Sequence, residues 1–88
     1  MNKAVVHATV DEFWYVLKGQ GEIWRNNGLK SKVTKLVAGT AIDIASGTVF
    51  QYRNIANEEL TFLCITMPSW PNDTEASYVD NGKWIPTV

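Results

Sequence analysis

The chain has 88 residues, which is enough for one domain and too few for a second hydrophobic core. Hydrophobic residues make up 45% of it and charged residues 19%, a balance typical of a folded domain and not of a disordered segment. The net charge is −1 with both signs scattered, and the one basic cluster, Lys30, Lys32 and Lys35, suits the solvated face of a strand. We therefore expect neither nucleic acid nor a membrane as a partner.

The N-terminal residues 1–3 lead directly into a strand-like run without an apolar targeting segment, and no stretch is long enough to cross a bilayer. A cytoplasmic location is the expectation. Cys64 is the single cysteine, so no disulfide can form within the chain. Because Cys64 lies in the apolar run Leu60–Met67, we expect it to be a small buried hydrophobic residue.

Short runs of β-branched and aromatic residues, separated by turn residues, predict strands along most of the chain. Gly19 and Gly21 mark one turn, and Asn26-Asn27-Gly28 predicts a hairpin because Asn and Gly tolerate positive φ. In chain order, the expected strands are Lys3–Val10, Glu12–Leu17, Glu22–Asn26, Leu29–Val37, Thr40–Ile44, Thr48–Arg53 and Leu60–Met67.

No window shows a convincing helical period, and one helical turn is expected at Asp73–Ser77, capped by Asn72 or Asp73. Residues 69–88 are expected to form an irregular C-terminal tail whose aromatic residues, Trp70 and Trp84 among them, lie across the body of the protein. The spacing of short strands and turns predicts an all-β sandwich or barrel.

Alternation along Glu12–Leu17 separates two apolar faces, one with Trp14 and one with Tyr15. One face can line an interior, whereas the other needs cover from the tail or from a second subunit. The same alternation puts Phe50 and Tyr52 on one face of their strand and turns Arg53 away from it.

Two spacings carry a family resemblance. Four residues separate His7 from Glu12, and six more lead to Gly19; five residues separate Gly39 from Ala45-Ser46-Gly47, followed by two residues to Phe50 and three to Asn54. Over residues 5–54 these spacings resemble the two motifs of the cupin superfamily, and the run Phe62–Trp70 resembles the last barrel strand of small single-domain cupins. The resemblance implies an antiparallel double-stranded β-helix, a jelly-roll barrel, as one domain over residues 1–88.

Cupins commonly hold iron, manganese, zinc or nickel with three His and one Glu. In this sequence His7 and Glu12 match two of those positions, while Val5 and Phe50 stand at the other two and Ala45 replaces the usual Pro. A stable divalent site normally takes three or four protein ligands. We therefore expect no tightly bound metal or other cofactor; a divalent transition metal, if one were bound, would use His7 and Glu12.

The leading functional expectation is a metal-poor cupin that binds a small organic ligand in a pocket formed by His7, Glu12, Trp14, Phe50 and Tyr52. The alternative is a small enzyme of the isomerase, lyase or dioxygenase kind, in which the candidate catalytic residues are His7, Glu12 and Tyr52. The missing metal ligands weigh most against the dioxygenase. A third possibility is a dimeric interaction or regulatory module.

Six residues precede His7, fewer than the strand usually found before the first motif in small cupins. An unpaired sheet edge invites another chain. We therefore expect a homodimer in which the N-terminal strand or the C-terminal tail of one subunit completes or covers the sheet of the other.

Overall fold

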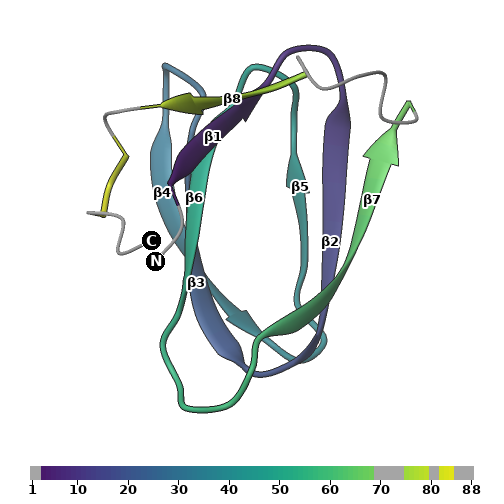
Figure 1. The fold of residues 1–88 in the computed structure, drawn as a ribbon, viewed down its shortest axis with the longest axis vertical. Helices are drawn as coiled ribbons and strands as arrows, with labels where there is room; N and C mark the ends of the chain where they lie inside the picture. Colours follow the sequence, from purple (N-terminus) through teal and green to yellow (C-terminus); the bar gives the residue numbers. More distant parts are fainter. Residues whose placement is uncertain (1–2, 69–74, 80–81, 85–88) are drawn as a thin grey trace.

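The protein folds into two antiparallel β-sheets that face one another (Figure 1). The structure is a computed structural model, which describes residues 3–68, 75–79 and 82–84. Within this part the strands are β1 (Ala4–His7), β2 (Asp11–Lys18), β3 (Gln20–Asn26), β4 (Ser31–Val37), β5 (Ala41–Ile44), β6 (Val49–Asn54), β7 (Thr61–Met67) and β8 (Ala76–Val79). The sheet orders are β4-β3-β6-β1-β8 and β5-β2-β7.

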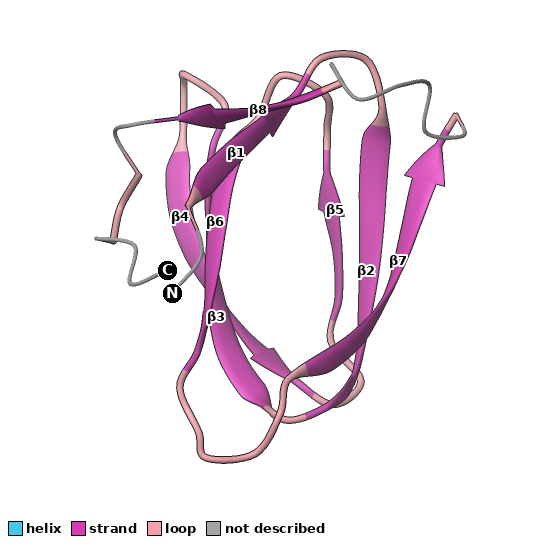
Figure 2. Cartoon of the chain, in the orientation of Figure 1, coloured by secondary structure: helices cyan, strands magenta, loops and turns pink. Residues whose placement is uncertain are grey.

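Strands and loops account for the described chain, which confirms the predicted all-β class (Figure 2). None of the described segments is a helix long and apolar enough to span a membrane.

The core lies between the two sheets and follows the predicted alternation of β2. Trp14 and Val16 are buried, whereas Phe13, Tyr15 and Leu17 on the opposite face of the strand are exposed. The buried core cluster is Trp14, Val16, Ile23, Leu36, Ile42, Ile44 and Phe50. Strand β2 therefore gives one face to the interior and the other to solvent, as the period of two requires.

The hairpin predicted at Asn26-Asn27-Gly28 joins β3 to β4. Gly28 has φ +90°, and the side-chain oxygen of Asn27 accepts hydrogen bonds from the backbone N–H groups of Leu29 and Lys30 at 2.9 and 2.8 Å. Since these bonds hold the loop closed, β4 begins at Ser31, two residues later than predicted.

The predicted helical turn at Asp73–Ser77 is wrong where the structure describes it, because Ala76 and Ser77 belong to strand β8. Positions 73–74 lie outside the described residues, as does Trp70. The tail is thus not irregular throughout: β8 pairs with the edge of β1, and tertiary pairing of this kind overrides a weak local helix signal.

Glu75, which precedes β8, fixes the turn between β1 and β2. Its carboxylate accepts hydrogen bonds from the Thr9 N–H at 2.5 Å, the Thr9 hydroxyl at 2.6 Å and the Val10 N–H at 2.9 Å. These bonds, above all the one from the Thr9 hydroxyl, hold the pKa of Glu75 below its ordinary value. A segment distant in sequence therefore shapes the turn that follows His7.

The end of the described chain covers the outer face of β6. Trp84 exchanges two 2.8 Å hydrogen bonds with the side-chain amide of Gln51, and the Arg53 guanidinium lies 4.2 Å from the centre of the Trp84 ring. Arg53 also pairs with Glu22 on this outer face, with its Nε 2.8 Å from the Glu22 carboxylate. The predicted outward direction of Arg53 is confirmed.

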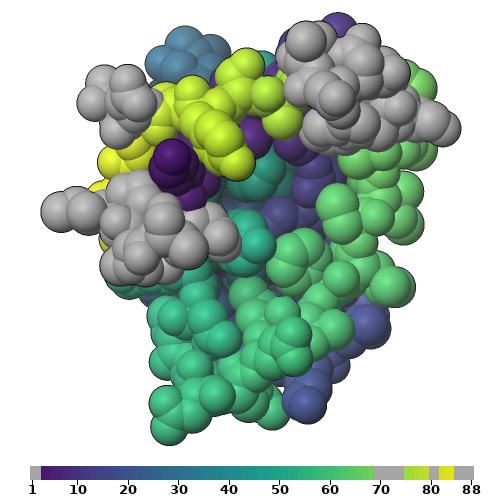
Figure 3. Space-filling model, viewed as in Figure 1, coloured from purple at the N-terminus to yellow at the C-terminus, as the bar shows by residue number. Residues whose placement is uncertain are grey.

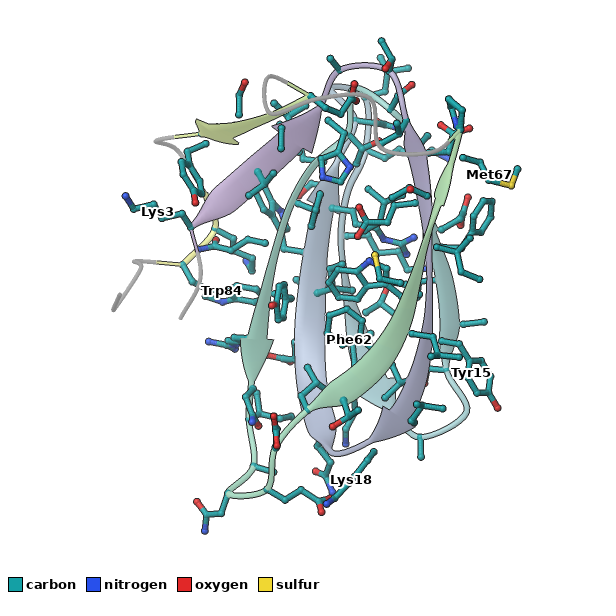
Figure 4. All side chains as sticks on the ribbon, turned by 45° about the vertical axis from the view of Figure 1, so that its right-hand side comes forward. Lys3, Tyr15, Lys18, Phe62, Met67 and Trp84 are labelled. Carbon is teal, nitrogen blue, oxygen red and sulfur yellow. The ribbon has the colours of Figure 1, made fainter. Side chains whose placement is uncertain are left out.

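The outer face of the sheet β5-β2-β7 keeps large apolar side chains in contact with solvent. Tyr15 and Met67 point away from the barrel interior, whereas Phe62 points into it (Figure 4). Six side chains form this face, and they are between 40% and 56% exposed: Phe13, Tyr15, Leu17, Leu63, Ile65 and Met67. We call these six residues the apolar outer face.

Candidate functional site

The four positions aligned with cupin metal ligands come together in the fold. Val5 and Phe50 are directly opposite each other in the pairing of β1 with β6, and His7 follows Val5 on the same face of β1. Glu12 reaches the same region from β2, and its carboxylate lies 3.1 Å from Nδ1 of His7. His7, Glu12 and Phe50 are each no more than 6% exposed. The two sequence spacings therefore describe one three-dimensional site.

Glu12 is the centre of a small polar cluster. Its Oε1 accepts a hydrogen bond from the indole N–H of Trp14, the residue two positions along on the same face of β2, and a second one from the thiol of Cys64 at 3.0 Å. Its Oε2 faces the His7 imidazole. Both carboxylate oxygens are engaged, so this buried acid is oriented by three neighbours.

Aromatic rings surround that cluster on the interior side. Trp14 stacks on Phe62 at a centroid distance of 4.0 Å and meets the edges of Phe50 and Tyr52 at 6.0 and 5.0 Å. Phe50 also lies edge-on to the His7 ring at 5.2 Å. The structure thus brings together all five residues of the predicted pocket, and Tyr52 is the half-buried one among them.

The interior remains accessible along β7. This strand pairs with β2 and forms the edge of its sheet, so no further strand among the described residues pairs beside its inward side chains, Phe62, Cys64 and Thr66. Figure 3 shows the surface hollowed between β7 and the strands β1 and β6. Cys64 is exposed even though its sulfur contacts the buried Glu12. Solvent therefore reaches the edge of the Glu12 cluster.

The expectation that Cys64 is buried is wrong. The run Leu60–Met67 is apolar on both faces, so its alternation could not show which face meets the interior, and it gave no sign that β7 is an open edge. The register places Cys64 opposite Trp14 and Thr66 opposite Glu12. Only this pairing reveals Cys64 as a member of the site.

The environment of Cys64 suppresses its ionisation. Partial burial of the thiol, its hydrogen bond to Glu12 and the negative charge of that carboxylate together raise the pKa of Cys64 to about 12. Because the thiolate is the nucleophilic form, Cys64 is a weak nucleophile at neutral pH. Its contribution to the site is to donate a hydrogen bond.

The donor set does not fit the metal that the cupin resemblance implies. Val5 and Phe50 carry no lone pair, and the carboxylate of Glu12 is already engaged by Trp14, Cys64 and His7. Among the described residues, no three His, Cys, Asp or Glu side chains are grouped so as to hold a metal ion. With two matching ligands that face each other, the site lacks the three or four ligands of a stable centre.

We predict that Glu12→Gln makes Cys64 more reactive toward iodoacetamide. Removing the carboxylate charge lowers the thiol pKa, and each unit of that fall raises the thiolate fraction about tenfold. The rate rises less, about threefold per unit, because a thiolate of lower pKa is a weaker nucleophile. The rate is measured at mildly alkaline pH by mass spectrometry. Glu22→Gln, a carboxylate paired with Arg53 on the outer face, is the matched control and should leave the rate unchanged. Equal rates in wild type and Glu12→Gln would contradict the Cys64–Glu12 contact.

We also predict that the double substitution Val5→His and Phe50→His creates a metal site. These positions are opposite each other beside His7, so two added imidazoles complete a set of three His and one Glu. Affinity for Zn²⁺ or Ni²⁺, measured by calorimetry, should rise more than about a hundredfold over wild type. Either single substitution should give less. No gain in the double variant would show that the motif alignment is wrong.

Comparison with known proteins agrees with this geometry. Residues 2–66 match the family model of the cupin domain, a stretch that contains both motifs and strands β1 to β6 in full. No curated protein matches the chain significantly. The match covers most of the chain, and the two-sheet architecture is that of a double-stranded β-helix. This small protein belongs to the cupin family.

Proposed function

We propose that this cupin binds a small organic molecule at the open edge beside β7, without a tightly bound metal. The observation that carries the proposal is the solvent-accessible Cys64 in contact with the buried, oriented Glu12 carboxylate. A cluster of aromatic rings beside a few fixed polar groups is the usual chemistry of a small-molecule site.

The contacts of the site indicate which ligand groups would be recognised. Half-buried Phe62 and Tyr52 offer apolar surface to a flat ligand, and the two rings are in edge contact at 5.7 Å. Glu12 and His7 supply polar anchors behind them. A ligand with an apolar ring and one hydrogen-bond donor that replaces the Cys64 thiol on Glu12 suits this arrangement.

The proposal predicts a selective response of the Trp14 indole N–H in proton–nitrogen NMR spectra. Phenol, indole and benzamidine serve as probes, since each has an aromatic ring and a hydrogen-bond donor. The Trp14 signal should shift saturably because its indole shares Glu12 with the ligand, whereas the Trp24 indole, bonded to Ser31, should stay in place. Glu12→Gln should weaken binding several-fold, and Glu22→Gln should not. Shifts of equal size at both indoles, or none at Trp14, would refute the proposed site.

An enzymatic role is the second candidate, and the 3.1 Å contact between His7 and Glu12 supports it. A buried imidazole–carboxylate pair can remove and return a proton beside a carbonyl without a metal, as isomerisation and elimination require. Deuterium uptake by a bound carbonyl compound, present in wild type and lost in His7→Gln, would distinguish this role from binding alone.

We further propose that the protein is a homodimer. A dimer would also serve the third functional class, an interaction or regulatory module. The apolar outer face gathers six large apolar side chains, each between 40% and 56% exposed, and a contiguous exposed apolar patch of this kind commonly marks an interaction surface. A shallow groove of about 380 Å³, lined in part by Phe13, Tyr15 and Ile65, lies on this face. A second copy supplies side chains to fill it.

Charges at the two ends of the face favour an antiparallel two-fold arrangement. Asp11 and Asp43 lie at one end, and Lys18, turned to this side by the bulge after Val16, pairs with Thr61 at the other. Two copies packed face to face in opposite directions would place Lys18 of each near the aspartates of the other. Exchange of the N-terminal strand or the tail stays the alternative geometry; within the chain, β1 is paired on both sides, with β6 and β8.

Sedimentation at micromolar concentration tests the dimer. Ile65→Lys places a charge in the middle of the apolar outer face and should yield monomers. Leu29→Lys is the matched control, because Leu29 is 93% exposed in the β3–β4 loop, away from the face, and should leave the dimer intact. A wild-type monomer would contradict dimer formation, and a dimer that survives Ile65→Lys but is lost on deleting residues 1–6 would favour strand exchange.

A further inference from the structure

A second recess lies outside the Glu12 cluster, between the β3–β4 hairpin and strand β5. Its volume is about 210 Å³, and it is lined by Arg25, Asn27, Lys30, Lys32, Asp43, Ala45 and Thr48. None of these residues belongs to the proposed small-molecule site. The volume is below the 300–1,000 Å³ of typical drug-sized pockets, so the recess suits a small group.

Positive charge is concentrated in this recess. Among the described residues that line it, Arg25, Lys30 and Lys32 are cationic and Asp43 is the acidic side chain. Arg25 and Lys32 are directly opposite in the pairing of β3 with β4, a position in which like charges destabilise a sheet. An anion bound between them would remove that repulsion.

Arg25 is held in place before any ligand arrives. One terminal nitrogen donates to the backbone carbonyl of Asp43 at 2.7 Å, and the other donates to the Thr34 hydroxyl at 3.1 Å. The Asp43 carboxylate lies 3.8 Å from the guanidinium and its side chain is 74% exposed. Solvent therefore screens the attraction between the two charges, and the ion pair is weak. A guanidinium fixed in this way loses little entropy on binding an anion.

The hairpin fixes a second side of the recess. The Asn27 side chain bonds the N–H groups of Leu29 and Lys30, which orders the backbone that carries Lys30. Thr48 is 7% exposed and adds a buried hydroxyl-bearing residue to the lining. The recess therefore combines ordered backbone with cations from two strands and a loop.

We propose that this recess binds a phosphate group, either free inorganic phosphate or the terminal phosphate of a small ester. A doubly charged tetrahedral anion matches the excess positive charge, and guanidinium and ammonium groups are the usual side-chain partners of phosphate oxygens. The proposal rests on the recess alone and does not depend on the function proposed for the Glu12 site.

The test compares Lys32→Gln with Lys35→Gln. Both remove one lysine charge from β4, but Lys35 is opposite Glu22 and does not line the recess. Inorganic phosphate and glycerol 2-phosphate are titrated in separate experiments against NMR signals of Arg25 and Thr48, with sodium chloride at matched ionic strength as the reference. Lys32→Gln should weaken phosphate binding about fivefold, whereas Lys35→Gln should leave it within twofold.

Tighter binding of the ester than of inorganic phosphate would identify an organic phosphate as the ligand, and the reverse would identify the free ion. Equal loss in the two variants, or shifts that chloride reproduces, would overturn the proposal, because either result would mean a diffuse effect of surface charge. An absence of saturable shifts for both phosphates would overturn it as well.

Discussion

The packing of Trp14 in the centre of the barrel is the interaction on which the rest of the protein depends. Its ring stacks on Phe62 of the β5-β2-β7 sheet and meets Phe50 and Tyr52 of the other sheet edge-on, so one side chain joins the two sheets. Its indole N–H also orients Glu12. Core packing and the polar site are thus built from the same residue, and a truncation that loosened the core would release the carboxylate as well.

The substitutions at the motif positions change the chemistry of the interior and leave its architecture in place. Val5 and Phe50 still project beside His7, but they supply apolar volume where other cupins supply imidazoles. The Glu12 carboxylate instead accepts hydrogen bonds from Trp14 and Cys64 and contacts the His7 imidazole. Of the three groups that contact this carboxylate, Cys64 is the exposed one, because it lies on the edge strand β7.

The two sheets differ in how their outer faces are treated. Trp84, in the C-terminal part of the chain, contacts Gln51 and Arg53 of β6 and so covers the outer face of that strand. The outer face of β5-β2-β7 keeps its apolar side chains exposed. Burying apolar surface is the main driving force of association, so this asymmetry is the physical reason to expect a second subunit on one side of the protein and not on the other.

Alternation and motif spacing by themselves determined the all-β class, the inner and outer faces of β2 and the convergence of His7, Glu12 and Phe50, because a strand directs its side chains by a fixed period of two. Only the tertiary structure decided the role of Cys64, of Glu75 and of strand β8. Cys64 meets Glu12 across 52 positions of sequence, and Glu75 meets Thr9 across 66. Contacts between residues so far apart in the sequence depend on strand register and on which sheet edge stays open, and no local pattern of residues predicts either of these.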